Sequence, residues 1–167
     1  MRVSHGAGRD GSALASRGDR VQTRCMPGLE HVVTISAPPA RVWEVLADVE
    51  RWPERIPTVD AAERLDEGPL AVGSRTRLRQ PRLPEAVWTV TELDEGRSFT
   101  WESRSPGVAI SASHVVEPHA GGTCLALAVD VSGPVAPLGW LLTRRLTRRY
   151  VETEAASISR AAEEGAA

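Results

Sequence analysis

Residues 29–53 read LEHVVTISAPPARVWEVLADVERWP and predict a strand that is followed directly by two short helices. Every second residue from Leu29 to Ile35 falls on one side of an extended chain, as expected for a half-buried strand. Pro38 and Pro39 end this strand and favour the first turn of a helix that stops near Asp48. A second short amphipathic segment follows, so the domain is expected to begin with a strand and two short helices.

Beyond residue 57 the sequence predicts six short strands and then one long helix, because apolar runs alternate with clusters of Gly, Pro and Asp. The strands are expected at residues 58–65, 73–80, 86–92, 97–103, 108–116 and 123–131. Consecutive strands joined by short turns pair antiparallel. The helix is expected from Pro134 to about Glu163, and its apolar stripe consists of Leu138, Leu142, Leu146, Tyr150 and Ile158. We expect this stripe to cover one face of the sheet.

The apolar residues of these strands also predict the register of the hairpins, since side chains alternate between the two faces of a sheet. The pairing that gathers apolar residues on one face sets His114 opposite Leu125 and Trp101 opposite Ile110. The shared face then contains Leu78, Trp88, Val90, Phe99, Trp101, Ile110, Ala112, His114, Leu125 and Leu127. Arginines, threonines and serines occupy the opposite face, which is expected to be solvated.

The order of a strand, Ala37-Pro38-Pro39, a helix ending near Asp48 and then Trp52-Pro53 resembles the start of START-like (SRPBCC) domains, in the polyketide cyclase/dehydrase-like branch. The resemblance covers residues 29–163. It implies an α+β helix-grip fold, in which a seven-stranded antiparallel sheet wraps around a long C-terminal helix and two short helices lie between strands 1 and 2. It also implies a cavity between sheet and helix for a hydrophobic or aromatic molecule that is polyketide-, lipid- or quinone-like.

The resemblance and the expected register together predict which side chains line such a cavity. The predicted lining consists of Leu78, Trp88, Val90, Phe99, Trp101, Ile110, Ala112, His114, Leu125, Leu127, Leu142, Leu146 and Tyr150. Two interpretations of His114 stay open: it bonds a neighbouring backbone group, or it orients a ligand carbonyl or hydroxyl, as Thr76 and Gln80 would less directly. The aromatic residues can equally fill an ordinary core, with the Tyr150 hydroxyl at the surface. Trp140 is expected on the side of the helix that faces away from the sheet.

The sequence shows no motif for nucleophilic catalysis, phosphate binding or metal binding, so no catalytic residue, metal or cofactor is assigned. Binding of a small molecule is therefore the preferred function. One alternative is an aromatase/cyclase, as some relatives are, in which His114 and Tyr150 would supply acid–base chemistry. The other is a non-enzymatic partner or lipid-carrier domain. It would use an arginine stripe, formed by Arg144, Arg145, Arg148 and Arg149, for which a solvated helix face is the simpler explanation.

Composition limits the remaining classes of protein. A formal net charge of -2 gives no general attraction to nucleic acid, and the longest apolar stretch is far too short to span a bilayer. No secretory signal is recognisable, which predicts a cytoplasmic location. Residues 1–27 lack periodicity and predict a disordered leader with Met26 as an alternative start, and residues 28–164 form the expected ligand-binding domain. The oligomeric state stays open.

Overall fold

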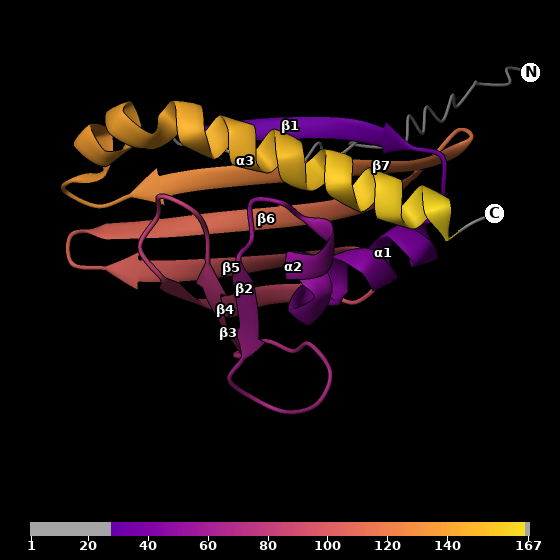
Figure 1. The fold of residues 1–167 in the computed structure, drawn as a ribbon, viewed down its shortest axis with the longest axis horizontal. Coiled ribbons are helices and arrows are strands. Elements are labelled where there is room, and N and C mark those ends of the chain that lie inside the picture. Colours follow the sequence, from indigo (N-terminus) through magenta and orange to yellow (C-terminus); the bar gives the residue numbers. More distant parts are fainter. Residues whose placement is uncertain (1–27, 166–167) are drawn as a thin grey trace, which may run out of the picture.

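A computed structural model describes residues 28–165, so the expected leader at residues 1–27 lies outside the described residues. Figure 1 shows the arrangement of the elements. In chain order they are β1 (Gly28–Ile35), α1 (Pro39–Ala47), η1 (Val49–Arg51), α2 (Trp52–Arg55), β2 (Ala61–Arg64), β3 (Arg75–Arg79), β4 (Ala86–Asp94), β5 (Ser98–Ser105), β6 (Val108–His119), β7 (Gly122–Ser132) and α3 (Ala136–Glu164). The predicted elements are all present, and their ends differ from expectation by a few residues.

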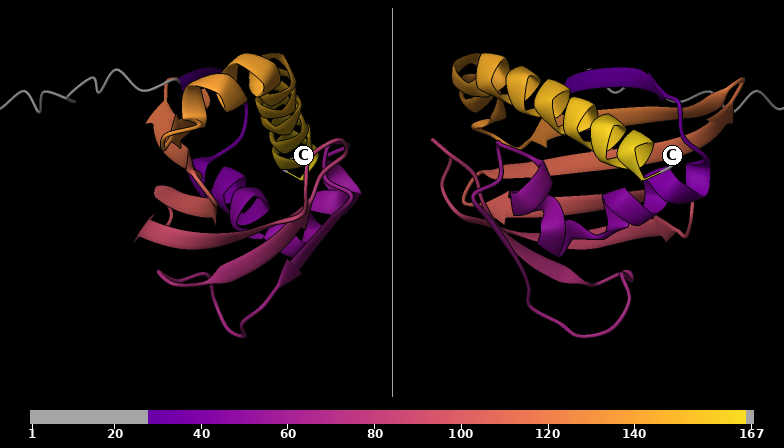
Figure 2. Two further views of the ribbon diagram at one scale, coloured as in Figure 1. Left: turned by 90° about the vertical axis from the view of Figure 1, so that its left-hand side faces the viewer. Right: turned by 45° about the vertical axis from the view of Figure 1, so that its right-hand side comes forward.

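The strands form one seven-stranded antiparallel sheet in the order β1-β7-β6-β5-β4-β3-β2. The sheet is curved, and the helices lie on its concave side (Figure 2). The long helix α3 contacts β1, β7 and α1. This is the helix-grip arrangement that the sequence predicts.

The register of the hairpins differs from the predicted one by two residues. Trp101 pairs with Ala112 instead of Ile110, and His114 pairs with Leu127 instead of Leu125. The turns are shorter than expected: β5 and β6 are joined only by residues 106–107, and β6 and β7 only by residues 120–121. The second residue of each turn is a glycine with positive φ, a conformation that two-residue hairpins favour. Since a shift of two residues preserves the alternation, the side chains of β5, β6 and β7 keep their predicted faces, whereas between β4 and β5 a bulge between Val90 and Glu92 breaks the alternation.

The predicted apolar stripe of α3 does not face the sheet along its whole length. Leu138 and Leu142 are 64% and 75% exposed, whereas Tyr150 and Ile158 are buried. The reason is geometric: an α-helix turns about 100° per residue, so residues spaced by four drift about 40° around it at each step. The stripe therefore begins on the solvent side and reaches the core only from Tyr150 onward. Trp140, predicted to face away, is partly buried on the inner side.

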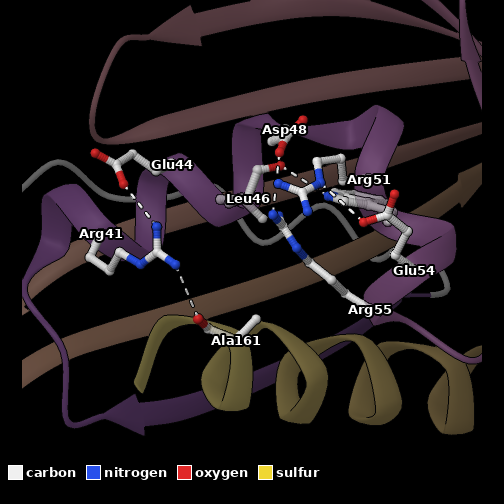
Figure 3. Close-up of polar contacts among 9 residues, drawn as sticks. Arg41, Glu44, Leu46, Asp48, Arg51, Glu54, Arg55 and Ala161 are labelled. Carbon is white, nitrogen blue, oxygen red and sulfur yellow. Dashed lines mark hydrogen bonds and ion pairs between the residues drawn. The ribbon is translucent and has the colours of Figure 1, made fainter. Parts of the chain in front are cut away.

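The C-terminal half of α3 closes the core against the two short helices. Ile158 and Ala162 are almost fully buried, as is Trp52 of α2, whose indole Nε1 donates to the Leu46 carbonyl at 3.2 Å. The guanidinium of Arg41 on α1 donates to the carbonyl of Ala161 at 3.4 Å, and Figure 3 shows this contact bridging the two helices. The ion pair between Arg55 of α2 and Asp48, the residue after α1, is also drawn there. Packing and hydrogen bonds thus hold the C-terminal half of α3 against the short helices.

Candidate functional site

A histidine at the centre of β6 and a carboxylate in the middle of α3 lie close together between the sheet and the long helix. The Nε2 atom of His114 lies 3.1 Å from Oε1 of Glu154, and the two side chains are only 4% and 16% exposed. A carboxylate acceptor requires the proton on Nε2, which leaves Nδ1 of a neutral imidazole as an acceptor. The sequence analysis considered a backbone group or a ligand as the partner of His114. The structure instead gives it a side chain of the long helix, Glu154.

Aromatic rings enclose the other side of the His114 imidazole. The ring of Phe99 stacks on it at 4.2 Å between centroids, and the rings of Trp101 and Trp52 lie 5.7 Å and 6.0 Å away. Trp88 extends the cluster at 5.3 Å from Trp101. The predicted wall of Trp88, Phe99 and Trp101 is therefore continuous, and the histidine sits against it.

The Nδ1 atom of His114 is buried and has no hydrogen-bond partner within residues 28–165. Buried polar atoms in native proteins are nearly always paired, and leaving one unpaired costs about 1–3 kcal/mol. The imidazole thus presents one bonded nitrogen to α3 and one unused acceptor to its aromatic surroundings. A ligand hydroxyl is the kind of group that would satisfy it.

Most of the other predicted lining residues lie on the concave face of the sheet. The buried ones are Leu78, Val90, Phe99, Trp101, Ala112, Leu125 and Leu127, together with Thr76. Trp88, Ile110, Leu146 and Gln80 are partly buried. The hydroxyl of Tyr150 donates to the carbonyl of Pro81, so it ties α3 to the connection between β3 and β4 and is already occupied. Leu142 was predicted to line the interior, and this prediction is wrong: its side chain is 75% exposed to solvent.

The inner side of the first half of α3 carries a glycine and two threonines beside the partly buried Trp140 and Leu146. Thr143 donates its hydroxyl to the Gly139 carbonyl at 2.8 Å, and Thr147 donates to the Thr143 carbonyl at 3.2 Å. Both threonines and the glycine are only partly buried, and a Cβ added at Gly139 would meet no heavy atom within 4 Å. There is therefore open space beside Gly139, whereas the inner residues of the C-terminal half are closely packed.

Glu154 is the functional candidate that the sequence analysis missed. It stands midway between Tyr150 and Ile158, four residues from each, and all three are directed inward. A carboxylate within an apolar stripe was the available signal, since buried charges are rare unless they are paired. The apolar stripe predicted for the long helix left out Glu154, the one charged residue that lies on it.

Two grooves lie outside this interior site. One, of about 350 Å³, runs between β1 and α3, and its lining is Gly28, Leu29, Trp140, Arg144, Arg145 and Arg148. The other, of about 320 Å³, lies beside α1 and includes Arg64. Arg64 and the backbone N–H of Arg75 both donate to the Asp66 carboxylate and lower its pKa. Neither groove is lined by His114 or Glu154.

No helix of residues 28–165 is both long and apolar enough to cross a membrane. Nor does any group of three or more His, Cys, Asp or Glu side chains in these residues gather in a way that could hold a metal ion.

Comparison of the sequence with known proteins gives two matches. Residues 26–163 match the family described as "Polyketide cyclase / dehydrase and lipid transport". A putative polyketide cyclase from Streptomyces halstedii is 34% identical over 90 residues, which cover 54% of this chain and 70% of that relative.

Solved structures share the fold. The aromatase/cyclase Zhui from Streptomyces sp. R1128 is 25% identical with a TM-score of 0.61, over 83% of this chain and 92% of that chain. The di-domain ARO/CYC StfQ from the steffimycin biosynthetic pathway has a TM-score of 0.69 at 14% identity, and covers 84% of this chain. This chain spans only about half of StfQ, 52% of its length. A START superfamily protein from Mycobacterium smegmatis has a TM-score of 0.65 at 17% identity, over 82% and 97% of the two chains.

Proposed function

We propose that this chain, which belongs to the polyketide cyclase / dehydrase and lipid transport family, binds a polyketide-related hydrophobic molecule between its sheet and α3. The observation that carries the proposal is the buried, unpaired Nδ1 of His114 inside an aromatic cluster. Ligand sites are mostly apolar and contain a few placed polar groups, and the combination here has that character.

The surroundings of His114 favour a particular ligand chemistry. Trp88 is the member of the aromatic wall that is only partly buried, and its ring suits a planar conjugated ligand, because aromatic pairs gain from stacked and edge contacts beyond the area they bury. With Nε2 donating to Glu154, the free Nδ1 accepts a proton donor. A hydroxylated aromatic or enolic compound matches both features.

We infer that such a ligand lies under the first half of α3. Three of its inner residues, Gly139, Thr143 and Thr147, are small and only partly buried, whereas the inner residues of the C-terminal half are closely packed. The start of α3 is held over the β5–β6 turn by the bond from Val135 N–H to the Gly107 carbonyl, at 3.2 Å.

A second function, aromatase/cyclase activity, is favoured by the His114–Glu154 pair itself. In such a reaction Nδ1 would remove a proton from the carbon next to a carbonyl, and that carbon would bond to a second carbonyl, whose oxygen takes up the proton before water is lost. Glu154 would hold the imidazole in orientation and stabilise the imidazolium that forms. The predicted partnership with Tyr150 is less favoured, because its hydroxyl is bonded to Pro81.

Titration of intrinsic tryptophan fluorescence tests the binding proposal. We expect a saturable change with hydroxylated aromatic compounds. His114→Ala should weaken their binding at least tenfold while leaving the corresponding methyl ethers nearly unaffected. Ser113→Ala, the adjacent residue on the opposite face of β6, is the matched control. The absence of any saturable change across hydroxylated aromatic, quinone and fatty-acyl compounds would overturn the proposal.

Mass spectrometry after addition of a linear polyketide separates the two functions. Loss of water from the compound in the presence of the protein would support the enzyme. Glu154→Gln keeps a hydrogen-bonding group beside His114 but removes the charge that stabilises an imidazolium. It should therefore retain binding and lose conversion. Binding without any conversion would leave the ligand-binding function alone.

A further inference from the structure

We propose that the solvent side of the first half of α3 is a docking surface for an anionic lipid bilayer. This surface, called here the Leu/Arg face, consists of Leu138, Leu141, Leu142, Arg145, Arg148 and Arg149. The proposal concerns the outside of the helix and does not depend on which ligand lies beneath it.

The six side chains project from one side of the helix. At about 100° per residue, they fall within an arc of about 120°, and the partly buried Thr143 and Thr147 lie on the opposite side. The three leucines are 64%, 61% and 75% exposed, which is unusual for three large apolar side chains within five residues. Nothing in residues 28–165 covers them, so the face is apolar and open.

The charge of this segment is entirely positive. No Asp or Glu occurs between Val131 and Val151, although the whole chain has a net charge of -2. Within the described residues none of Arg144, Arg145, Arg148 and Arg149 forms an ion pair, whereas arginines elsewhere, such as Arg41 and Arg77, do. Four unpaired guanidinium groups next to exposed leucines create a local field that attracts anions.

A bilayer surface fits this combination better than a soluble partner. Figure 1 shows the first turns of α3 at one end of the molecule, where the helix forms an outer edge. Arg145 and Arg148 also line the groove beside β1, but none of the three exposed leucines does, so the leucines stand outside any groove that could receive a peptide. Leucines on such an edge can enter the acyl boundary, while arginines extend their stems and keep their charges among the headgroup phosphates. Val135, half exposed and anchored on the β5–β6 turn, adds to the apolar end.

The test is cosedimentation of the full chain with vesicles of phosphatidylglycerol and phosphatidylcholine, compared with phosphatidylcholine alone. We expect binding to the anionic vesicles only, and weaker binding as salt is raised. Arg145→Gln together with Arg148→Gln should weaken binding about 25-fold, since one arginine near an anionic surface corresponds to about fivefold in affinity. Leu138→Ser with Leu141→Ser should also release the protein.

The controls place the same chemical changes elsewhere on the surface. Val32→Ser on β1, at 53% exposure, and Arg79→Gln on β3 should leave vesicle binding unchanged. Circular dichroism should show all variants folded, because each substituted side chain is exposed. No binding to anionic vesicles, or equal binding by the Leu/Arg variants, would overturn the proposal. Capture of the chain by polyglutamate but not by vesicles would assign the face to an acidic protein and also overturn it.

The test is separable from the ligand-binding experiment. Fluorescence titration of the Leu138→Ser, Leu141→Ser variant reports on the interior site, and its result does not depend on vesicles. Failure of ligand binding with intact vesicle binding would refute only the proposed function. The reverse outcome would refute only the docking surface.

Discussion

The two halves of α3 belong to one continuous helix and meet opposite environments. From Tyr150 onward the inner residues pack against α1 and the sheet, and Ala155, Ile158 and Ala162 are almost fully buried. Before Tyr150 the inner residues Gly139, Thr143 and Thr147 are only partly buried, and three leucines are exposed to solvent. The C-terminal half therefore holds the fold together. The first half is free to serve contacts that are not part of the core.

The local chemistry of the first half agrees with this division. Threonine hydroxyls that bond back to the carbonyl four residues earlier slightly weaken and often bend a helix, and α3 has two of them in the first half, at Thr143 and Thr147, and one beyond Tyr150, at Thr153. In Figure 2 the first turns of α3 run at an angle to the rest of the helix. The start of α3 lies beside the β5–β6 turn, where the Val135 N–H donates to the Gly107 carbonyl.

The largest effect is expected at the packed half. Ile158→Ala removes a buried side chain and should lower the free energy of unfolding by about 2–5 kcal/mol. Urea denaturation followed by circular dichroism measures this. A cost below about 1 kcal/mol would show that the C-terminal half is not packed as described.

The boundary between the halves is tested at Glu154. Glu154→Ala leaves the buried His114 without a partner at either nitrogen and should destabilise the protein by about 1–3 kcal/mol. Glu154→Gln retains an acceptor and should cost less. Thermal unfolding of the two variants side by side gives the comparison, and equal costs would mean that the hydrogen bond to His114 contributes nothing.

A smaller effect is expected where the helix meets the β3–β4 connection. Tyr150→Phe keeps the ring and removes only the hydroxyl that donates to Pro81, so the loss should be about 0.5–1.5 kcal/mol. Hydrogen exchange of residues 80–85 should become faster in this variant. Unchanged stability together with unchanged exchange would show that the loop is held by other contacts.

The sequence predicted the sheet better than the helix, and for a physical reason. Strand periodicity is two, so the error of two residues in pairing Trp101 and His114 left the side chains of β5, β6 and β7 on their correct faces. Helix periodicity is not four, so a stripe traced at four-residue steps from Leu138 rotated out of the core. Periodicity also could not show Glu154 as a partner of His114, because that contact joins residues forty apart.

The smallest expected effect is at Leu142, and it completes the comparison with Ile158. Both substitutions to alanine delete a large apolar side chain from the same helix, but Leu142 is 75% exposed and Ile158 only 1%. Leu142→Ala should therefore change the free energy of unfolding by less than about 0.5 kcal/mol. Urea denaturation at two protein concentrations is the appropriate measurement.

A cost close to that of Ile158→Ala at both concentrations would mean that the first half packs within its own chain. A cost that grows with concentration would mean that a second copy covers the leucines. In either case the solvent side of this half would no longer be an open surface, and the division of α3 into a packed and an available half would have to be abandoned.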